Sequence, residues 1–84
     1  MAKVTIYTKI GCPYCVAALR LLNQKHANIT EIEAATDANK RREMNEKSGR
    51  NTFPQIFIGE KHVGGCDDIY ALDAQGELDP LLNA

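Results

Sequence analysis

Residues 4–22, VTIYTKIGCPYCVAALRLL, decide the fold, because an extended pattern passes into a helical pattern within a few residues. Over residues 3–8, Val4 and Ile6 alternate with other residue types and β-branched side chains are frequent, which predicts a strand. From residue 13 to about residue 25, apolar residues recur at helical spacing after a proline that suits a first turn. The residues expected on the inner face of this helix are Val16, Ala18, Leu19 and Leu22.

The remainder of the chain continues the alternation of strands and helices. The further predicted elements are a strand over residues 29–34, a polar helix over residues 37–48, a hairpin of strands over residues 55–58 and 61–64, and a helix from residues 64–65 to about residue 73. The first two strands should be parallel, because a helix-length connection joins them. The pattern thus predicts an α/β fold in the order β-α-β-α-β-β-α, a four-stranded mixed sheet flanked by three helices.

The later helices have weaker apolar faces than the first. Asp37 is the expected N-cap of the polar helix and Gly49 its expected end. The packing candidates are Ala38, Met44 and the stem of Arg41 in this helix, and Ile69, Tyr70 and Leu72 in the next one. The tail carries Leu78, Leu81 and Leu82, which either dock on the core or form a last turn of helix.

Length and composition restrict the classes of protein to which the chain can belong. Its 84 residues, 44% of them hydrophobic, predict one domain over residues 1–84 with one modest core. A net charge of -1 provides no field that would attract nucleic acid or an anionic membrane. The first residues lack the pattern of a signal peptide, and no apolar run is long enough to span a membrane. With three cysteines, an odd number, these features predict a cytoplasmic protein with thiol chemistry rather than a secreted disulfide framework.

Cys12 and Cys15 form a Cys-x-x-Cys pair at the predicted junction of strand and helix. Unpaired backbone N–H groups and the positive end of the helix dipole favour a thiolate at the start of a helix, so Cys12 is the predicted nucleophile. Cys15 lies about one turn further on, where its sulfur could attack a mixed disulfide formed on Cys12. Pro13 shapes the loop between the two sulfurs and removes one backbone donor.

A structural zinc site is the main alternative use of the cysteines. Zinc prefers four tetrahedral Cys or His ligands, often supplied as two closely spaced pairs. Apart from Cys12 and Cys15, the chain offers only isolated Cys66 and the distant His26 and His62. The second pair is missing, so we predict no metal site and expect the two histidines to be exposed or capping residues.

Three segments together resemble the glutaredoxin family, in particular its small bacterial dithiol members. They are Cys12-Pro13-Tyr14-Cys15, Thr52-Phe53-Pro54 and Gly64-Gly65-Cys66-Asp67-Asp68, and the resemblance covers essentially the whole chain. It implies a thioredoxin-like fold and an enzyme that uses glutathione to reduce protein disulfides and protein–glutathione mixed disulfides. Glutathione would be a reducing co-substrate with no permanently bound cofactor, the other partners would be disulfide-containing or glutathionylated proteins, and the protein would be a monomer.

The resemblance also implies a set of glutathione contacts. Pro54 would follow a cis peptide bond, and the backbone of Phe53 would pair with the cysteinyl part of glutathione. The residue pattern alone favours a trans proline that starts the strand over residues 55–58. The other implied contacts are the Gly65, Cys66 and Asp67 segment at the γ-glutamyl end, Lys9 and Thr52 at the glycine end, and Tyr14 beside the sulfur.

The chain departs from the family pattern beside Thr52. Many relatives have arginine before the threonine and valine after it, whereas Asn51 and Phe53 occupy these positions here and Arg50 lies one step away. Cys66 is expected to be a small, partly buried residue rather than a third catalytic thiol.

Three other functions stay open at this point, and the last of them, a purely structural or partner-binding domain, leaves the three matching segments unexplained. The first is a protein that a flavoprotein reductase recharges, as thioredoxins are recharged, although thioredoxins usually carry Trp-Cys-Gly-Pro-Cys. The second is an iron–sulfur protein that shares a cluster through Cys12 and glutathione, against which Pro13 and Tyr14 argue.

Overall fold

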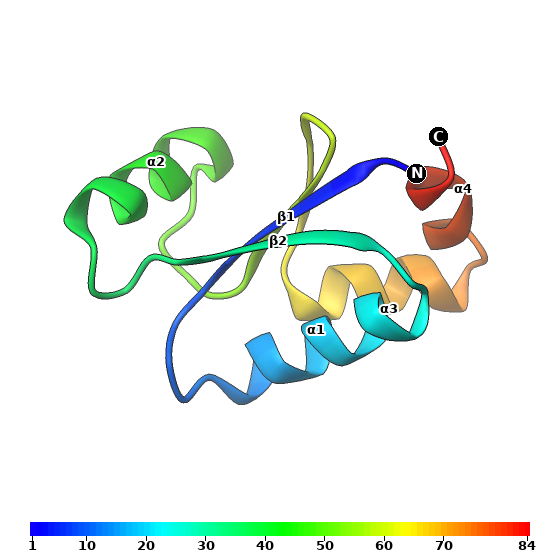
Figure 1. The fold of residues 1–84 in the computed structure, drawn as a ribbon, viewed down its shortest axis with the longest axis horizontal. Coiled ribbons are helices and arrows are strands. Elements are labelled where there is room, and N and C mark those ends of the chain that lie inside the picture. The colour runs from blue at the N-terminus through cyan, green and yellow to red at the C-terminus, as the bar shows by residue number, and fades with distance from the viewer.

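The computed structural model describes residues 1–84 and contains the predicted sequence of elements, with one short helix added at the end (Figure 1). The elements are β1 (Lys3–Thr8), α1 (Pro13–Gln24), β2 (Asn28–Glu33), α2 (Ala38–Ser48), β3 (Gln55–Ile58), β4 (Lys61–Gly64), α3 (Cys66–Ala74) and α4 (Leu78–Leu82). The predicted bounds of β1, β3 and β4 are confirmed, whereas β2 lies one residue earlier than expected. The leucine-rich tail forms α4 and also docks, because Leu78 and Leu82 are buried.

The four strands form one mixed sheet in the order β2-β1-β3-β4. β1 and β2 are parallel, with Lys3 opposite Asn28 and Thr8 opposite Glu33, as the helical crossover between them requires. β3 is antiparallel to both β1 and β4. The predicted four-stranded mixed sheet is therefore confirmed.

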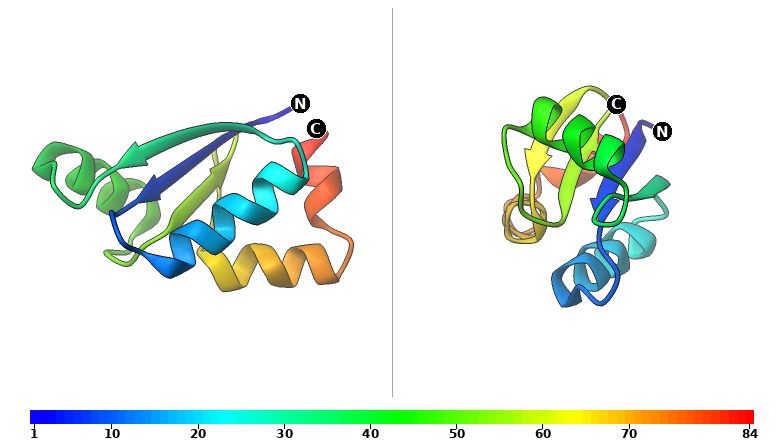
Figure 2. Two further views of the ribbon diagram at one scale, coloured as in Figure 1. Left: turned by 60° about the horizontal axis from the view of Figure 1, so that its bottom comes forward. Right: turned by 90° about the vertical axis from the view of Figure 1, so that its left-hand side faces the viewer.

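The alternation along the central strands sends side chains to two different layers. Val4, Ile6, Ile56 and Ile58 belong to the larger core cluster, which also contains buried residues of α1, α3 and α4. α1 and α3 lie side by side along one face of the sheet (Figure 2). Burial of these apolar side chains is the main stabilising contribution to the fold.

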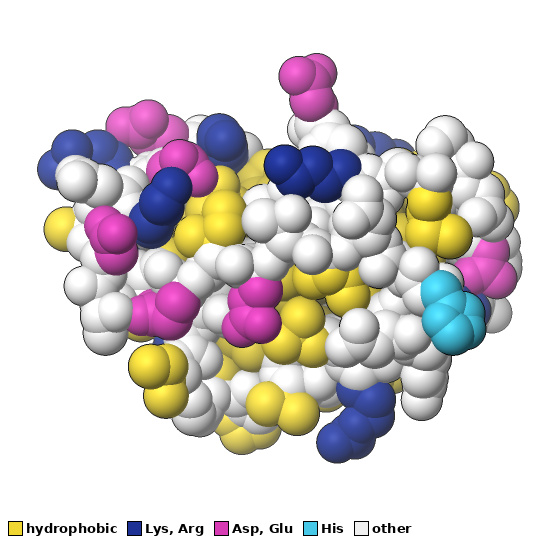
Figure 3. Space-filling view, viewed as in Figure 1, with side chains coloured by type: hydrophobic (Ala, Val, Ile, Leu, Met, Phe, Trp, Pro, Cys, Tyr) yellow, Lys and Arg dark blue, Asp and Glu magenta, His cyan; other side chains and the backbone are white.

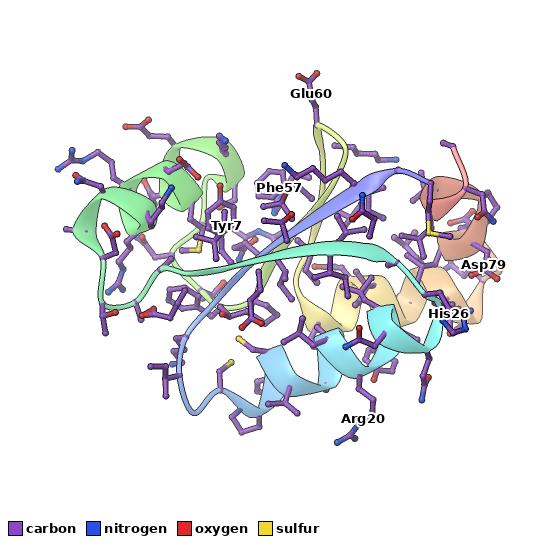
Figure 4. All side chains as sticks on the ribbon, in the orientation of Figure 1. Tyr7, Arg20, His26, Phe57, Glu60 and Asp79 are labelled. Atoms are coloured by element: carbon purple, nitrogen blue, oxygen red, sulfur yellow. The ribbon has the colours of Figure 1, made fainter.

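The other face of the sheet packs against α2. Tyr7 and Phe57 meet edge to face on this side, with ring centroids 5.8 Å apart, and form a smaller cluster with Ala34 and Met44 (Figure 4). The Tyr7 hydroxyl donates a hydrogen bond of 2.5 Å to the Glu43 carboxylate. α2 is therefore attached to the sheet by one buried methionine and one tyrosine–carboxylate contact.

The inner face of α1 differs from the prediction at Val16. The buried residues of this helix are Cys15, Ala18, Leu21 and Leu22, whereas Val16 is 54% exposed. Successive residues of a helix are rotated by about 100°, so placing the Cys15 side chain toward the sheet turns Val16 outward. Hydropathy alone did not show that a cysteine, rather than the neighbouring valine, faces the core.

Predicted packing in α2 and α3 is confirmed only in part. Met44 and Ile69 are buried, but Ala38 and Arg41 are exposed and Tyr70 is 42% exposed. The Tyr70 hydroxyl donates to the Ala17 carbonyl 3.0 Å away, so its ring lies across the α1–α3 contact instead of entering the core. The expected caps of α2 are confirmed, with Asp37 accepting two backbone N–H bonds and Gly49 in the left-handed conformation. Positive and negative side chains alternate over α2 in Figure 3.

Polar contacts connect the ends of the helices. The Lys25 ammonium at the end of α1 lies 2.7 Å from the Asp73 carboxylate and 3.0 Å from the Asp79 carboxylate. The Ala2 N–H donates to the Leu82 carbonyl at 2.9 Å, which holds both ends of the chain together. Every helix is too short or too polar to cross a membrane.

Candidate active site

Cys12 is the N-cap residue of α1 and directs its sulfur at the first turn of that helix. Its backbone is extended, with φ -99° and ψ 107°, and the Cys15 N–H donates to Cys12 Sγ over 3.2 Å. Pro13 occupies the first helical position, and no acidic residue lies in the first turn. A sulfur in this place therefore accepts a backbone N–H at the positive end of the helix with no nearby carboxylate in the same turn.

Cys15 sits one turn further along, and both thiols are free and almost completely buried, each 3% exposed. Burial, followed by the hydrogen bond to Cys12, raises the pKa of Cys15 to about 12. The backbone N–H and the charge of Lys9 act in the opposite direction but are outweighed. Cys15 is therefore a protonated thiol at neutral pH.

The segment before β3 forms the second part of the site. The Phe53–Pro54 peptide bond is cis, as the family resemblance implies. Thr52 is exposed, Phe53 is half-buried and Pro54 is buried. The side chain of buried Gln55 is hydrogen-bonded to this segment, because its amide nitrogen donates to the Thr52 carbonyl at 2.9 Å and to Thr52 Oγ1 at 3.0 Å.

The third part of the site is the start of α3, where two glycines allow a close approach of backbones. Gly64 has φ +116°, and a Cβ there would overlap the Asp68 carboxylate. A Cβ on Gly65 would lie 3.3 Å from the Pro54 carbonyl, so this glycine brings the start of α3 close to the cis-proline segment.

The two adjacent aspartates in α3 have different surroundings. The Asp68 carboxylate accepts the Gly65 N–H at 2.8 Å and lies 3.5 Å from Arg50 Nη1, so it caps the helix and connects it to the segment after α2. Asp67 is exposed and makes no such bond to a protein group. Of the two aspartates, Asp67 is thus the one whose carboxylate has no protein partner.

Cys66 is more deeply buried than expected. It is 8% exposed and belongs to the larger core cluster. Burial, together with Asp67 and Cys12, raises the pKa of the Cys66 thiol. Cys66 is therefore a residue of the core, and its lack of a catalytic role stays a prediction.

Two grooves meet at Thr52 and Phe53. The first, which we call the α3 groove, has a volume of about 220 Å³ and is lined by Tyr14, Arg50, Thr52, Phe53, Pro54, Gln55, Gly65, Cys66, Asp67 and Asp68. The second, which we call the α2 groove, has a volume of about 360 Å³ and is lined by Lys9, Ala35, Arg41, Asn51, Thr52 and Phe53. The residues expected to contact glutathione, although far apart in the sequence, therefore lie along two adjoining grooves.

The α2 groove contains a residue that the sequence pattern did not identify as part of the site. Lys9 Nζ lies 6.0 Å and Arg41 Cζ 5.9 Å from the centroid of the Phe53 ring. From the sequence, only the stem of Arg41 was expected to pack, on the inner face of the polar helix. The available signal was its position three residues before buried Met44, which places both on the same side of α2.

The two histidines differ from one another. His26 is exposed and has φ +57° directly after α1, so the prediction of an exposed or capping residue is confirmed. His62 is half-buried, packs at 4.9 Å from Phe57 and lies 2.7 Å from Gln55 Oε1, so that prediction is wrong for His62. Burial lowers its pKa. No group of three or more His, Cys, Asp or Glu side chains is arranged to hold a metal ion.

Comparisons with known proteins identify a family. The model of the glutaredoxin family matches residues 4–63. The chain is 57% identical over 82 residues to glutaredoxin 3 of Escherichia coli strain K12, covering 98% of this chain and 99% of that protein. Among solved structures, it is similar to glutaredoxin from Brucella melitensis, with 60% identity, a TM-score of 0.85 and coverage of 98% of this chain and 89% of that one. A buckwheat glutaredoxin–glutathione complex has 30% identity and a TM-score of 0.86, covering 95% of this chain and 76% of that one.

Proposed function

This chain belongs to the glutaredoxin family of thiol–disulfide oxidoreductases and has its thioredoxin-like fold, and we propose that Cys12 and Cys15 reduce protein disulfides and protein–glutathione mixed disulfides with glutathione. The observation that carries the proposal is the position of Cys12 Sγ at the start of α1, with a backbone N–H 3.2 Å away and Tyr14 lining the adjoining α3 groove. We further propose a cytoplasmic monomer of one domain, with no permanently bound cofactor or metal and no nucleic-acid or membrane partner.

Glutathione in this proposal lies along both grooves. Its γ-glutamyl end would meet the Gly65–Cys66 backbone and the Asp67 carboxylate, since a helix start offers N–H groups to a carboxylate and Asp67 is free to face an ammonium group. Its cysteinyl part would pair with the Phe53 backbone beside Tyr14. Its glycine carboxylate would meet Lys9 and Thr52 at the α2 groove.

Deglutathionylation requires only Cys12. The Cys12 thiolate attacks the glutathione sulfur of the mixed disulfide, the substrate sulfur leaves as a thiolate, and a disulfide between Cys12 and glutathione is formed. A second glutathione thiolate then attacks the glutathione sulfur of that adduct, which yields glutathione disulfide and returns the Cys12 thiolate. Each exchange breaks one S–S bond and makes one.

Reduction of a protein disulfide requires Cys15 as well. The Cys12 thiolate attacks one sulfur of the substrate disulfide, which breaks that disulfide, releases the other substrate sulfur as a thiolate and forms a mixed disulfide. Cys15, after losing its proton, attacks the Cys12 sulfur, which releases the second substrate thiolate and forms the Cys12–Cys15 disulfide. Two glutathione molecules then reduce the Cys12–Cys15 disulfide. Cys12 contributes to the raised pKa of Cys15 through a hydrogen bond and charge, and this contribution disappears once Cys12 is in a mixed disulfide. The resolving thiol thus becomes easier to ionise when it is needed.

The energetics suit a glutathione-driven reaction. Glutaredoxins have reduction potentials of about -200 to -230 mV, and the cytosolic glutathione pool measured by extraction lies at about -220 to -260 mV. Reduction of the oxidised pair by glutathione is then balanced or modestly favourable.

The test compares the wild-type protein with Cys12→Ser and Cys15→Ser, in the presence of glutathione and glutathione reductase. We expect Cys12→Ser to lose both activities and Cys15→Ser to retain reduction of a mixed disulfide between glutathione and a small thiol while losing reduction of a protein disulfide. Equal losses in the two variants would contradict the division of roles. Turnover with thioredoxin reductase instead of glutathione would contradict the proposed reductant.

A further inference from the structure

A partly buried chain of hydrogen bonds runs from β4, at the edge of the sheet, to Thr52. Gln55, the first residue of β3, has no exposed surface, yet its side chain is fully hydrogen-bonded. Its amide nitrogen donates to the carbonyl and the hydroxyl oxygen of Thr52, and its amide oxygen lies 2.7 Å from His62 Nε2 on β4. One buried amide therefore links Thr52 to His62.

The partners determine where the hydrogen atoms lie. The Thr52 carbonyl can only accept, so the Gln55 amide must present its nitrogen to Thr52 and its oxygen to His62. A carboxamide oxygen cannot donate, so His62 Nε2 must carry a hydrogen. Burial and the charge of Arg50 lower the pKa of His62, while Asp68 acts in the opposite direction, which favours a neutral ring. Because Nε2 faces the Gln55 oxygen, this neutral ring is the Nε2–H tautomer.

Thr52 occupies a central place in the site, because it lines both the α3 groove and the α2 groove. A hydroxyl group has one donor and two acceptor positions. Gln55 fills one acceptor position of Thr52 Oγ1, so the hydroxyl hydrogen is left to point toward a ligand. An anionic group in the groove, such as a carboxylate, is the partner that this hydrogen would meet.

We propose that His62 and Gln55 are positioning residues for glutathione, which hold the carbonyl and hydroxyl of Thr52 so that the hydroxyl donates to a glutathione carboxylate. This inference rests on the proposed function, since it assigns a task to the same site. His62 acts through Gln55 and touches neither the ligand nor the sulfurs. Its role is to supply the N–H that keeps the Gln55 amide in one orientation.

The experiment measures the glutathione KM of wild type and two His62 variants. His62→Phe keeps a ring against Phe57 but removes the N–H donor, whereas His62→Gln supplies an amide N–H. We expect His62→Phe to raise the glutathione KM about fivefold, the effect of one lost net hydrogen bond, and His62→Gln to recover most of that loss. Lys61→Gln, on the exposed neighbouring position of β4, is the matched control and should leave KM unchanged.

Nitrogen-15 NMR of the His62 ring in the wild-type protein gives a second readout, which requires neither glutathione nor a correctly folded variant. The Nε2–H tautomer of His62 and a Gln55 side-chain amide protected from exchange support the inference. An Nδ1–H tautomer would overturn it. An unchanged KM in folded His62→Phe, with an active wild type, would overturn the inference alone, whereas a wild type inactive with glutathione would overturn the proposed function.

Discussion

α1 and α3 begin beside the same site but use their N-terminal ends differently. Both N-cap residues, Cys12 and Gly65, have extended backbones. At α1 the cap is a thiol whose own sulfur accepts the Cys15 N–H, and the first turn has no acidic residue. At α3 the cap has no side chain, the Asp68 carboxylate accepts the Gly65 N–H, and Asp67 adds a second negative charge.

The difference shows how one local structure can serve chemistry in one place and binding in another. The positive end of α1 acts on a sulfur within the helix, so any added carboxylate there would oppose a thiolate. At α3 the N-cap glycine supplies no side chain to the first backbone N–H groups, which leaves them open to an anion, while exposed Asp67 favours a ligand that also carries a positive charge. In the proposed function, this matches the carboxylate and ammonium of a γ-glutamyl group.

The prediction with the largest expected effect tests whether the Cys12 sulfur is needed for catalysis or only for the N-cap of α1. Serine is a good N-cap, so Cys12→Ser should reduce turnover to the uncatalysed background while changing the free energy of unfolding by less than about 1 kcal/mol. Glutathione-coupled turnover and urea unfolding would be measured on the same preparations. Arg20→Gln, on the face of α1 that points away from the sheet in Figure 4, should keep full activity. A large loss of stability in Cys12→Ser would mean that the sulfur serves the fold as well.

The second prediction concerns the ionisation of the other thiol of α1. A group with a pKa of about 12 is protonated below that value, so the thiolate fraction of Cys15 falls as pH falls. In Cys12→Ser, where burial still acts, alkylation of Cys15 by iodoacetamide should rise about tenfold per pH unit from about pH 7 to pH 10 without a plateau. Mass spectrometry at each pH would measure the rate. A plateau near neutrality would show that burial does not keep Cys15 protonated in this variant.

The third prediction concerns Gly64, next to the start of α3. Gly64→Ala combines an unfavourable φ of +116° with overlap on the Asp68 carboxylate, so it should lower the free energy of unfolding by more than about 2 kcal/mol and weaken glutathione binding. Gly59→Ala is the matched control, because its φ is +61° but its Cβ would meet nothing. That variant should cost about 1 kcal/mol from the backbone alone and spare binding. Equal losses of stability would show that the contact with Asp68 is unimportant.

The fourth prediction removes the free charge of α3. Asp67→Asn should raise the glutathione KM roughly threefold, the effect expected for one exposed ion pair, and the increase should shrink at high salt. Glu60→Gln removes an acid from the tip of the β3–β4 turn, which projects away from the sheet in Figure 4, and should leave KM unchanged. A salt-independent increase would point to a change in the shape of the groove instead.

The prediction with the smallest expected effect concerns an acidic residue introduced near the start of α1, where α3 already has two. Val16→Asp places a carboxylate near the start of α1 at a position that is 54% exposed. It should slow alkylation of Cys12 about twofold and stabilise the helix by about 0.5 kcal/mol, because the same charge opposes a thiolate and favours the helix dipole. Val16→Asn is the control, because its side chain has nearly the size of aspartate but carries no charge. Faster alkylation in Val16→Asp would contradict the electrostatic comparison of the two helices.

Much of the fold and of the site could be predicted because the signals were local. Alternation over Lys3–Thr8, the cap at Asp37 and the end at Gly49 each depend on a few neighbouring residues, and the structure confirms them. The three segments that resemble glutaredoxins were expected to form one site, and the structure places Tyr14, Pro54 and Gly65, one residue from each segment, along the α3 groove. The catalytic and glutathione-binding roles of these residues stay predictions.

The errors concern side chains whose environment is made by distant parts of the chain. Val16 was expected to face the core because it is apolar, but the direction of α1 on the sheet gives that place to Cys15. The contact between Gln55 and His62 was not predicted either, although a glutamine at the start of an apolar strand is a signal that a buried polar partner exists.

By itself, the sequence determined the order of the strands and helices, their caps and the two thiols at the start of α1, because backbone conformation and hydrophobic periodicity act over a few residues. Only the tertiary structure decided that Arg41 lies near Phe53, that Asp68 is occupied while Asp67 is free, and that Gln55 connects Thr52 to His62. These pairings depend on how helices pack on the sheet, since hydrogen bonds and charge contacts require distances that no local pattern specifies.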